Sequence, residues 1–573
     1  MYIDTVPNRT SSPAILLREG WREGRHTHKR TLANLSHWPA RKVEMLRRLL
    51  RDEVLVSPRD LFETERTRPH GHVEVILGTI RTLGLDRVIA SKRSRERTLV
   101  LAMIDERLIE PCSKLATTRL WHTTTLAEEL GVAAADEDEL YAAMDWLLAR
   151  QDRIEQTLAA RHLTDGGVVL YDVTSSYYEG RTCPLARFGH DRDGQTGRPI
   201  IVYGVLTDGD GRPVAVSVYP GNTGDPTTVP DQIEKLRQRF GLARLVLVGD
   251  RGMLTHPQID RLQAHPGLGW ITALTSVAIR KLVTEGALQL SLFDEQHLAE
   301  ITAPAFPGER LVACYNPLLA DERRRKRQAL LEATARDLTR LVREVTRRTK
   351  TPLTDAVIGM KAGKILARHK VGKHFDVRIA EGTCQWTRQD ASIASEAALD
   401  GIYVLRTSEP AARLSAEDTV RTYKGLSQVE RAFRCLKGID LLVRPIRHRT
   451  DTRVPAHIFL CVLAYYVEWH MRRALAPLLF EDEELPAARR RRDPVLPAKV
   501  GAAAQQKKAT HTTPEGLPVH SFQSLLAELA TRCRNTYRLK GEDTALTFSQ
   551  VPDLTAVQRR AYELLGLLPV TGK

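Results

Sequence analysis

The sequence predicts an α/β protein with a mixed β-sheet at its centre. Three apolar, β-branched runs come first and are typical of antiparallel strands; Asp208–Gly211 forms a tight turn between the second and the third. A helix and a fourth buried strand follow them along the chain. The three runs are residues 168–176, 200–206 and 213–219, the helix covers about 225–240, and the fourth strand is 245–250.

This element order is the ribonuclease-H-like order. In it the first and fourth strands lie side by side and parallel, about 4.8 Å apart. Asp172 lies on the first strand and Asp250 ends the fourth, so we expect the two carboxylates to face each other. Asp225 is the expected N-cap of the helix, with Pro226 at its first position.

The regions around this core complete the predicted organisation. About 180 residues separate Asp250 from Glu430, too many for a loop, so an inserted mixed domain that contains β-strands is expected there. Apolar residues at helical spacing between 95 and 162 predict a helical N-terminal domain. The predicted parts are residues 1–162 (a basic region and a helical, DNA-binding domain), 163–255 with 405–480 (the ribonuclease-H-like core), 256–404 (the inserted domain) and 481–573 (a linker and a helical C-terminal region).

Within the inserted domain we expect strands at residues 310–315, 374–380 and 401–406 and a charged helix at about 320–348. The run Asp321–Arg327 in that helix is either a solvated face or a DNA contact.

The charge balance favours a polyanionic partner. The 573 residues carry a net charge of +15, and 42% are hydrophobic, which is enough for packed cores. A polyanion of this kind is most often a nucleic acid, although many soluble proteins from GC-rich genomes are also basic. Residues 18–51 contain ten basic and three acidic side chains, which indicates a DNA-contacting module or, alternatively, a solvated basic face.

Neither a membrane nor an oxidising compartment is expected. The seven cysteines are scattered without a C-x-x-C pair, so neither a zinc site nor a disulfide framework is indicated. The N-terminus has no signal-peptide pattern. The apolar segment Ala456–Trp469 is too short to span a bilayer and predicts a buried core helix. We therefore expect a cytoplasmic protein.

The run around Glu430 carries the strongest chemical signal. Leu426, Glu430 and Lys437 follow Tyr423 by 3, 7 and 14 residues, which places all four on one helix face. An acid with a phenol and an amine on its own face suits a site for metal and phosphate.

Together with Asp172 and Asp250, Glu430 forms a predicted carboxylate triad for metal-dependent cleavage of nucleic acid. Such a triad can hold two divalent ions, Mg²⁺ or Mn²⁺, about 3.5–4 Å apart. In this arrangement Asp172 bridges both ions, while Asp250 and Glu430 each flank one. Any one acid alone would be explained as well by a surface carboxylate or a helix cap.

These residues resemble the DDE transposases of bacterial insertion sequences of the IS-four type. That group carries the signature Y-x2-R-x3-E-x6-K, which Tyr423, Glu430 and Lys437 match, whereas Leu426 replaces the arginine. The resemblance runs from about Pro13 to Arg473. Four further words also resemble one branch of the group: residues 171–180, 221–228, 248–253 and 444–449.

The resemblance implies a bacterial, nucleoid-associated protein that forms a homodimer on DNA ends and binds terminal inverted repeats. It would cut the element ends and join the 3′ ends to target DNA. Tyr423 and Lys437 would contact phosphate near the cut. Arg431, Arg434 or Arg251 could replace the missing arginine, and Leu426 could pack against the core.

Two other functions remain open at this point. The same fold serves metal-dependent nucleases that do not join strands, and a transposase descendant can keep DNA binding without catalysis. The presence of all three acids, the basic N-terminal region and the long insertion favour the active transposase.

Overall fold

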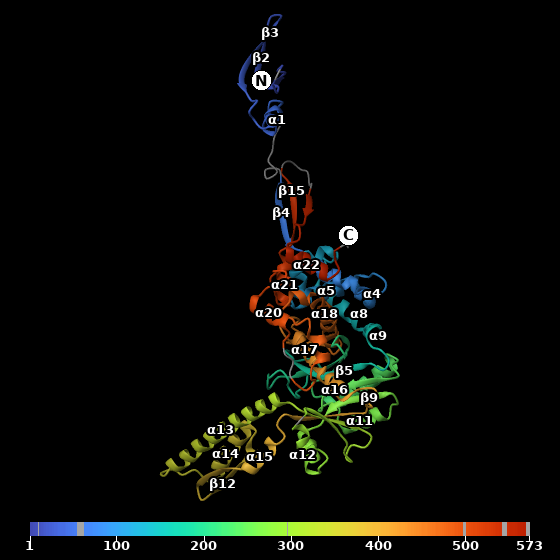
Figure 1. Ribbon diagram of the computed structural model, residues 1–573, viewed down its shortest axis with the longest axis vertical. Helices are drawn as coiled ribbons and strands as arrows, with labels where there is room; N and C mark the ends of the chain where they lie inside the picture. The colour runs from blue at the N-terminus through green and yellow to red at the C-terminus, as the bar shows by residue number, and fades with distance from the viewer. Residues whose placement is uncertain (10, 54–61, 295, 497–499, 541–546, 569–573) are drawn as a thin grey trace. The chain divides into compact units, whose positions relative to one another are not determined.

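The computed structural model (Figure 1) describes residues 1–9, 11–53, 62–294, 296–496, 500–540 and 547–568. The chain divides into two compact units. The first comprises Met1–Arg68 with Cys533–Asp553, and the second comprises Pro69–Arg532 with Leu554–Lys573.

The first unit contains two small antiparallel sheets. One has the order β1-β2-β3 and is followed by helix α1; the other has the order β16-β15-β4. The basic residues of the predicted module at 18–51 fall on β2, β3 and α1, where most side chains are exposed. The elements are β1 (Tyr2–Val6), β2 (Ala14–Glu23), β3 (His26–Asn34), α1 (Ala40–Leu49), β4 (Phe62–Pro69), β15 (Cys533–Leu539) and β16 (Thr547–Gln550).

Helices fill the second unit up to residue 162, which confirms the helical patterns at 95–162. Helix α5 shows why they form: the Ser94 side chain caps its N-terminus by accepting from the Arg97 N–H, and its apolar residues are buried. The helices are α3 (Gly71–Thr82), α4 (Leu85–Ile89), α5 (Arg95–Ile109), α6 (Lys114–Leu120), α7 (Leu126–Glu129), α8 (Glu137–Leu148) and α9 (Gln151–His162).

An eight-stranded sheet lies at the centre of the second unit, with the order β10-β11-β14-β9-β8-β5-β6-β7. Strands β5, β6 and β7 are antiparallel neighbours, and β8 pairs parallel with β5, so the predicted adjacency of the first and fourth strands is confirmed. The strands are β5 (Val168–Tyr177), β6 (Ile200–Asp208), β7 (Pro213–Pro220), β8 (Leu245–Val248), β9 (Leu268–Ala273), β10 (Leu298–Ile301), β11 (Arg310–Tyr315) and β14 (Ile402–Thr407).

The predicted turn between β6 and β7 is present, and its geometry explains its sequence. Asp208 Oδ1 accepts the N–H groups of Asp210 and Arg212, and Gly211 has a φ of +82°, which favours glycine.

The prediction for Asp225 is wrong. Gly224 occupies the N-cap position, and Asp225 begins a short 3-10 helix, Asp225–Thr228, with its carboxylate paired to Arg192. An α-helical turn, α10 (Val229–Glu234), and a π-helical turn (Lys235–Arg239) continue the segment.

The region between residues 256 and 404 has two parts. Strands β9, β10, β11 and β14 extend the central sheet, and helices α11 (His256–Gln263) and α12 (Ser276–Thr284) accompany them. The rest, residues 317–397, is called the insertion arm here. It consists of α13 (Pro317–Arg347), α14 (Asp355–His369), the hairpin of β12 (Phe375–Ala380) and β13 (Thr383–Arg388), and α15 (Asp390–Ala397).

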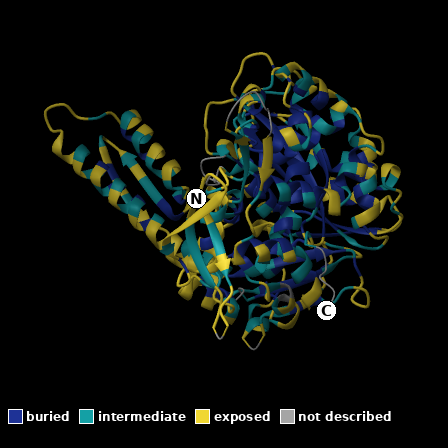
Figure 2. Cartoon of the chain, turned by 90° about the horizontal axis from the view of Figure 1, so that it is seen from above, coloured by how far each residue is buried: buried dark blue, intermediate teal, exposed yellow. Residues whose placement is uncertain are grey.

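Helix α18 (Arg453–Leu475) contains the apolar segment predicted to be a core helix. It packs against α5, α8, α17 and β7, and most of its residues are buried. The main buried cluster includes residues of α18 and of the central sheet, and Figure 2 shows buried residues concentrated in the interior of the larger body. Within the described residues, no helix has the length and apolar character needed to cross a membrane.

The remaining helices are α16 (Ala416–Lys424), α17 (Leu426–Lys437), α19 (Leu485–Arg491), α20 (Ala502–Thr510), α21 (Phe522–Ala530) and α22 (Ala556–Leu564).

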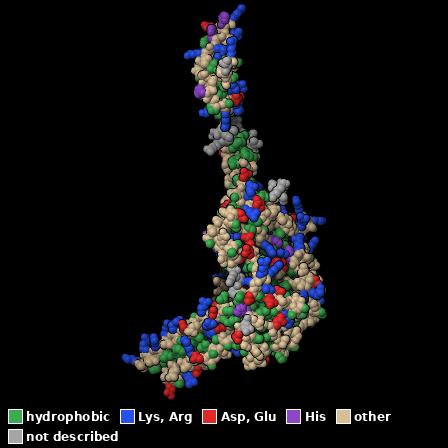
Figure 3. Space-filling view, in the orientation of Figure 1, with side chains coloured by type: hydrophobic (Ala, Val, Ile, Leu, Met, Phe, Trp, Pro, Cys, Tyr) green, Lys and Arg blue, Asp and Glu red, His purple; other side chains and the backbone are tan. Residues whose placement is uncertain are grey.

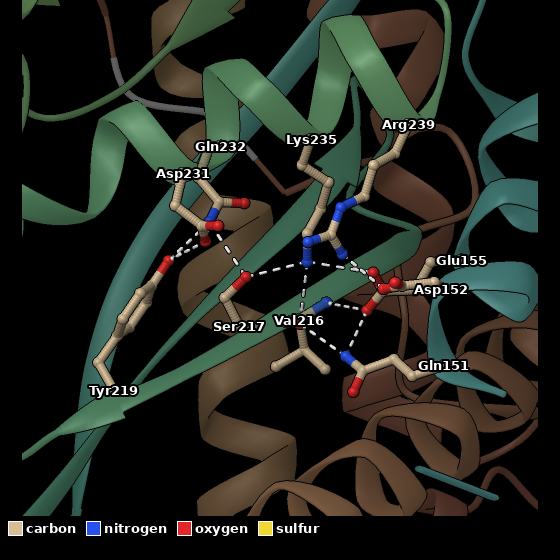
Figure 4. Close-up of polar contacts among 10 residues, drawn as sticks. All are labelled: Gln151, Asp152, Glu155, Val216, Ser217, Tyr219, Asp231, Gln232, Lys235 and Arg239. Atoms are coloured by element: carbon tan, nitrogen blue, oxygen red, sulfur yellow. Dashed lines mark hydrogen bonds and ion pairs between the residues drawn. The ribbon is translucent and has the colours of Figure 1, made fainter. Parts of the chain in front are cut away.

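A buried ion pair joins α9 to the π-helical turn Lys235–Arg239, and both of its partners form hydrogen bonds to the edge strand β7 (Figure 4). Lys235 Nζ lies 3.1 Å from Glu155 Oε2 and also donates to Val216 O and Ser217 Oγ. Glu155 Oε1 accepts the Val216 N–H at 3.0 Å. The two charged side chains are 4% and 1% exposed, so each depends on the other for compensation.

We predict that Glu155→Gln lowers the free energy of unfolding by about 3 kcal/mol, because it leaves the Lys235 ammonium buried without an opposite charge. Asp152→Asn is the matched control, since it breaks the neighbouring exposed pair with Arg239 and should cost less than about 1 kcal/mol. Urea unfolding of both variants measures the difference, and equal losses would contradict the prediction.

Candidate active site

Asp172 lies within β5, whereas Asp250 lies just beyond the neighbouring strand, because β8 ends at Val248 and not at residue 250 as predicted. In the parallel pair of β5 and β8, Leu170 is opposite Val248, and each aspartate comes two residues later in the chain. Side chains alternate along a strand, so Asp172 points to the same face of β5 as Leu170. The register therefore brings the two carboxylates together where β8 ends.

Glu430 reaches the same place from a helix. Helix α17 packs against β5 through an apolar face that includes Val429 and Phe433. Glu430 is exposed beside that face. The preceding helix α16 ends at Lys424, and Gly425 links the two helices with helical backbone angles.

The charges of Asp250 and Glu430 act on Asp172, which indicates that the three acids form one group. The pKa of Asp172 is raised to about 7, first by burial and then by the charges of Asp250, Glu430 and Asp225, against the N–H of Val173, which lowers it. Mutual repulsion of this kind requires that the carboxylates be close to one another.

Tyr423 belongs to the same group. The pKa of its phenol is raised to about 12, first by burial and then by the charges of Asp250, Asp172 and Glu430, while Arg251 lowers it. The phenol is therefore protonated at neutral pH and can donate a hydrogen bond. Arg251, next to Asp250 in the chain, has an exposed side chain.

The three acids fit a divalent metal by their chemistry. Asp172 Oδ1 accepts the Val173 N–H and Asp250 Oδ1 accepts the Met253 N–H, both at 2.8 Å, and the second oxygen of each carboxylate has no donor among the residues that the structure describes. Among the described residues, no lysine or arginine forms an ion pair with Asp172, Asp250 or Glu430. Uncompensated carboxylate oxygens are the ligands that Mg²⁺ and Mn²⁺ prefer.

A second acidic cluster is less suited to a metal. In the part of the chain that the structure describes, one group of three possible ligands has all its ligand atoms within 4.8 Å of one another: Cys435, Asp440 and Glu468. The oxygens of the triad are spread more widely. Arg472 already forms ion pairs with Asp440 and Glu468. That guanidinium supplies the positive charge a metal would bring.

The structure separates the residues expected to bind phosphate into two sets. Tyr423 and Arg251 lie at the triad, and Arg434 on α17 is exposed. Lys437 and Arg431 instead form ion pairs: Lys437 Nζ lies 2.8 Å from Asp193 Oδ1, and Arg431 pairs with Glu481.

Leu426 occupies the place of the signature arginine and is 9% exposed in the main core. The expectation that it packs against the core is confirmed.

Sequence reasoning missed an ionic network in the loop between β5 and β6. Asp193 has a side chain only 1% exposed, and it pairs with Arg444 as well as Lys437. Its Oδ2 also accepts the Tyr177 N–H at the end of β5. The preceding residue, Arg192, pairs with Asp225, and the charge of Asp225 raises the pKa of Asp172. The loop sequence looks like any polar turn, so no local signal identifies these residues.

Of the comparisons with known proteins, the one with protein families supports the site described above. Residues 164–467 match the family described as "Transposase DDE domain". No curated protein matches the chain. Among solved structures, a cryo-EM structure of the piggyBac transposase synaptic complex with hairpin DNA is similar at a TM-score of 0.34 and 9% identity, over 80% of this chain and 76% of that one.

We predict that Asp172→Asn stabilises the metal-free protein at pH 8 but not at pH 4. An unfolded aspartate loses its proton near pH 4, whereas folded Asp172 keeps it to about pH 7, so folding stability falls as the pH rises between these values. The gain at pH 8 should be on the order of 2–4 kcal/mol.

Urea unfolding with a chelator present measures this gain. Glu179→Gln is the control of opposite sign, because ion pairs with Arg447 and Arg198 lower the pKa of that exposed acid, so its loss should cost slightly at pH 8. A pH-independent effect of Asp172→Asn would contradict the prediction.

Proposed function

The chain belongs to the transposase DDE domain family, and we propose that it is the transposase of a bacterial insertion sequence. It would bind terminal inverted repeats, cleave DNA at the element ends and transfer the 3′ ends to target DNA by two-metal-ion phosphoryl transfer. The proximity of Asp172, Asp250 and Glu430 beside the end of β8 in the central sheet carries this proposal.

In the proposed reaction the three carboxylates are both the catalytic residues and the metal ligands. These carboxylates would hold divalent ions, Mg²⁺ or Mn²⁺, which would supply activation of the attacking water or 3′-hydroxyl and stabilisation of the leaving oxygen. The raised pKa of Asp172 supports this assignment, since bound cations would relieve the repulsion among the acids.

The residues around the triad would hold the DNA backbone. The protonated Tyr423 phenol can donate to a phosphate oxygen, and the exposed Arg251 and Arg434 can add positive charge. Lys437 and Arg431 would reach phosphate only by leaving Asp193 and Glu481. We therefore assign direct contact first to Tyr423, Arg251 and Arg434.

The proposed partners are the double-stranded DNA of the inverted repeats and of the target, together with a second copy of the chain. The net charge of +15 supports a DNA partner. We propose a homodimer in the DNA complex and a bacterial cytoplasmic protein that associates with the nucleoid when DNA-bound.

We predict that Asp172→Ala, Asp250→Ala and Glu430→Ala each abolish cleavage at the repeat tips while DNA binding persists. The reason is that each change removes a carboxylate from the proposed metal site but leaves the surrounding basic residues. Gel assays with Mg²⁺ and labelled repeat ends measure cleavage, joining and binding separately. Glu179→Gln, an acid close in sequence but ion-paired outside the triad, is the matched control and should cleave normally.

The same assay separates the alternatives. Joined products identify a transposase, nicks without joining identify a metal-dependent nuclease, and binding without cutting identifies a non-catalytic descendant. Cleavage retained in any one alanine variant would remove that residue from the triad.

A further inference from the structure

Helix α13 of the insertion arm has two opposite faces. Its inner face contains Leu331, Leu338 and Leu341, which are buried against α14 and the β12–β13 hairpin. Its outer face carries an arginine stripe, defined by five exposed residues at spacings of 11, 4, 3 and 4. The stripe is Arg325, Arg336, Arg340, Arg343 and Arg347.

These spacings place the five arginines within one side of the helix, since each step is close to a whole number of turns. The stripe extends over about 33 Å at 1.5 Å per residue. That length is close to one turn of a DNA duplex, about 34 Å.

Most of the positive charge of the stripe has no ion-pair partner among the described residues of the arm; the exposed Glu332, which lies on the same side of the helix, accepts a hydrogen bond from Gln328. The acids Asp337 and Glu344 of α13 turn toward α14, where His369 Nε2 lies 3.1 Å from Asp337 and Lys361 pairs with Glu344. Of the stripe, only Arg340 has an acid within 4 Å among the described residues, Asp337 at 3.7 Å, and its side chain is 84% exposed.

The arm as a whole concentrates the charge of the chain. Residues 317–397 contain 18 lysine and arginine side chains and 10 aspartate and glutamate side chains, a net +8 of the total +15. Figure 3 shows Lys and Arg side chains gathered along α13. Exposed charge of one sign at this density attracts a polyanion.

The base of α13 is held firmly to the sheet. Arg327, whose side chain is 8% exposed, pairs with Asp400 just before β14. Arg323 donates to the carbonyl oxygens of Leu399 and Ile402. The stripe is therefore presented on a helix that is anchored to the central sheet, and not on a loop.

We propose that the arginine stripe of α13 binds the phosphate backbone of duplex DNA independently of base sequence. The inference rests on the proposed function in one respect: a transposase must hold target DNA in addition to its own ends. Planar guanidinium groups suit phosphate oxygens, and Gln328, the glutamine beside the stripe, donates its side-chain amide to Glu332.

The test compares two variants of the full chain with equal charge. In the stripe variant, Arg336, Arg340, Arg343 and Arg347 are changed to Gln. In the control, Lys364, Lys370, Arg378 and Arg388, exposed elsewhere on the arm, are changed to Gln. Affinity for a random-sequence duplex of about 30 base pairs is measured from low to high salt, with a chelator present so that no cleavage occurs.

Each phosphate contact adds about 0.9 to the slope of log affinity against log salt. The stripe variant should lose about 3–4 from this slope and at least about tenfold in affinity at low salt, whereas the control should change little. The substituted side chains are exposed, so both variants should keep the circular dichroism spectrum of the parent.

Equal losses in the two variants would overturn the proposal in favour of general charge attraction. A loss confined to one DNA sequence would indicate base reading and also overturn it, as would unchanged duplex affinity with lost binding to phosphatidylserine vesicles. Because the assay needs no metal and no cleavage, its outcome is independent of whether the triad is catalytic.

Discussion

The candidate site depends on the parallel pairing of β5 with β8. This pairing places Asp172 beside the end of β8, which Asp250 follows, and a shift of one residue along β5 would turn Asp172 to the opposite face of the sheet. The register is held because β8 is buried along its whole length and β6, on the other side of β5, is buried as well. The apolar residues on these strands therefore hold the two charges together against their mutual repulsion.

Much of this arrangement follows from local sequence. The β-branched runs predict β5 to β8, and the turn at Asp208–Gly211 predicts how β6 meets β7, because each signal is contained within a few residues. The same holds for α18, whose apolar run is too short for a membrane and fits a core helix. The triad was predicted from its positions on these elements, and the electrostatic coupling of Asp172 to the other two acids agrees with that prediction.

The parts that sequence could not predict depend on distant partners. Strand β9, with its glycine and tryptophan, is not strongly patterned, and it pairs with β14 more than 130 residues away. Asp193 looks like a loop acid until Lys437, 244 residues later, is seen beside it. The prediction that Asp225 caps a helix is wrong for the same reason, because its carboxylate pairs with Arg192. Periodicity reports which residues face inward, but not which inward-facing residues meet.

Helix α18 joins the helices of residues 71–162 and the candidate active site into one folding unit. It contacts α5 and α8 on one side and β7 and α17 on another, so the layer that precedes the sheet in the chain shares its core. A protein fragment beginning at residue 163 would leave an apolar face of α18 in water and invite aggregation. Trimming this chain to its family-matched segment, residues 164–467, would thus keep every triad carboxylate yet remove the surface on which the helix behind them rests.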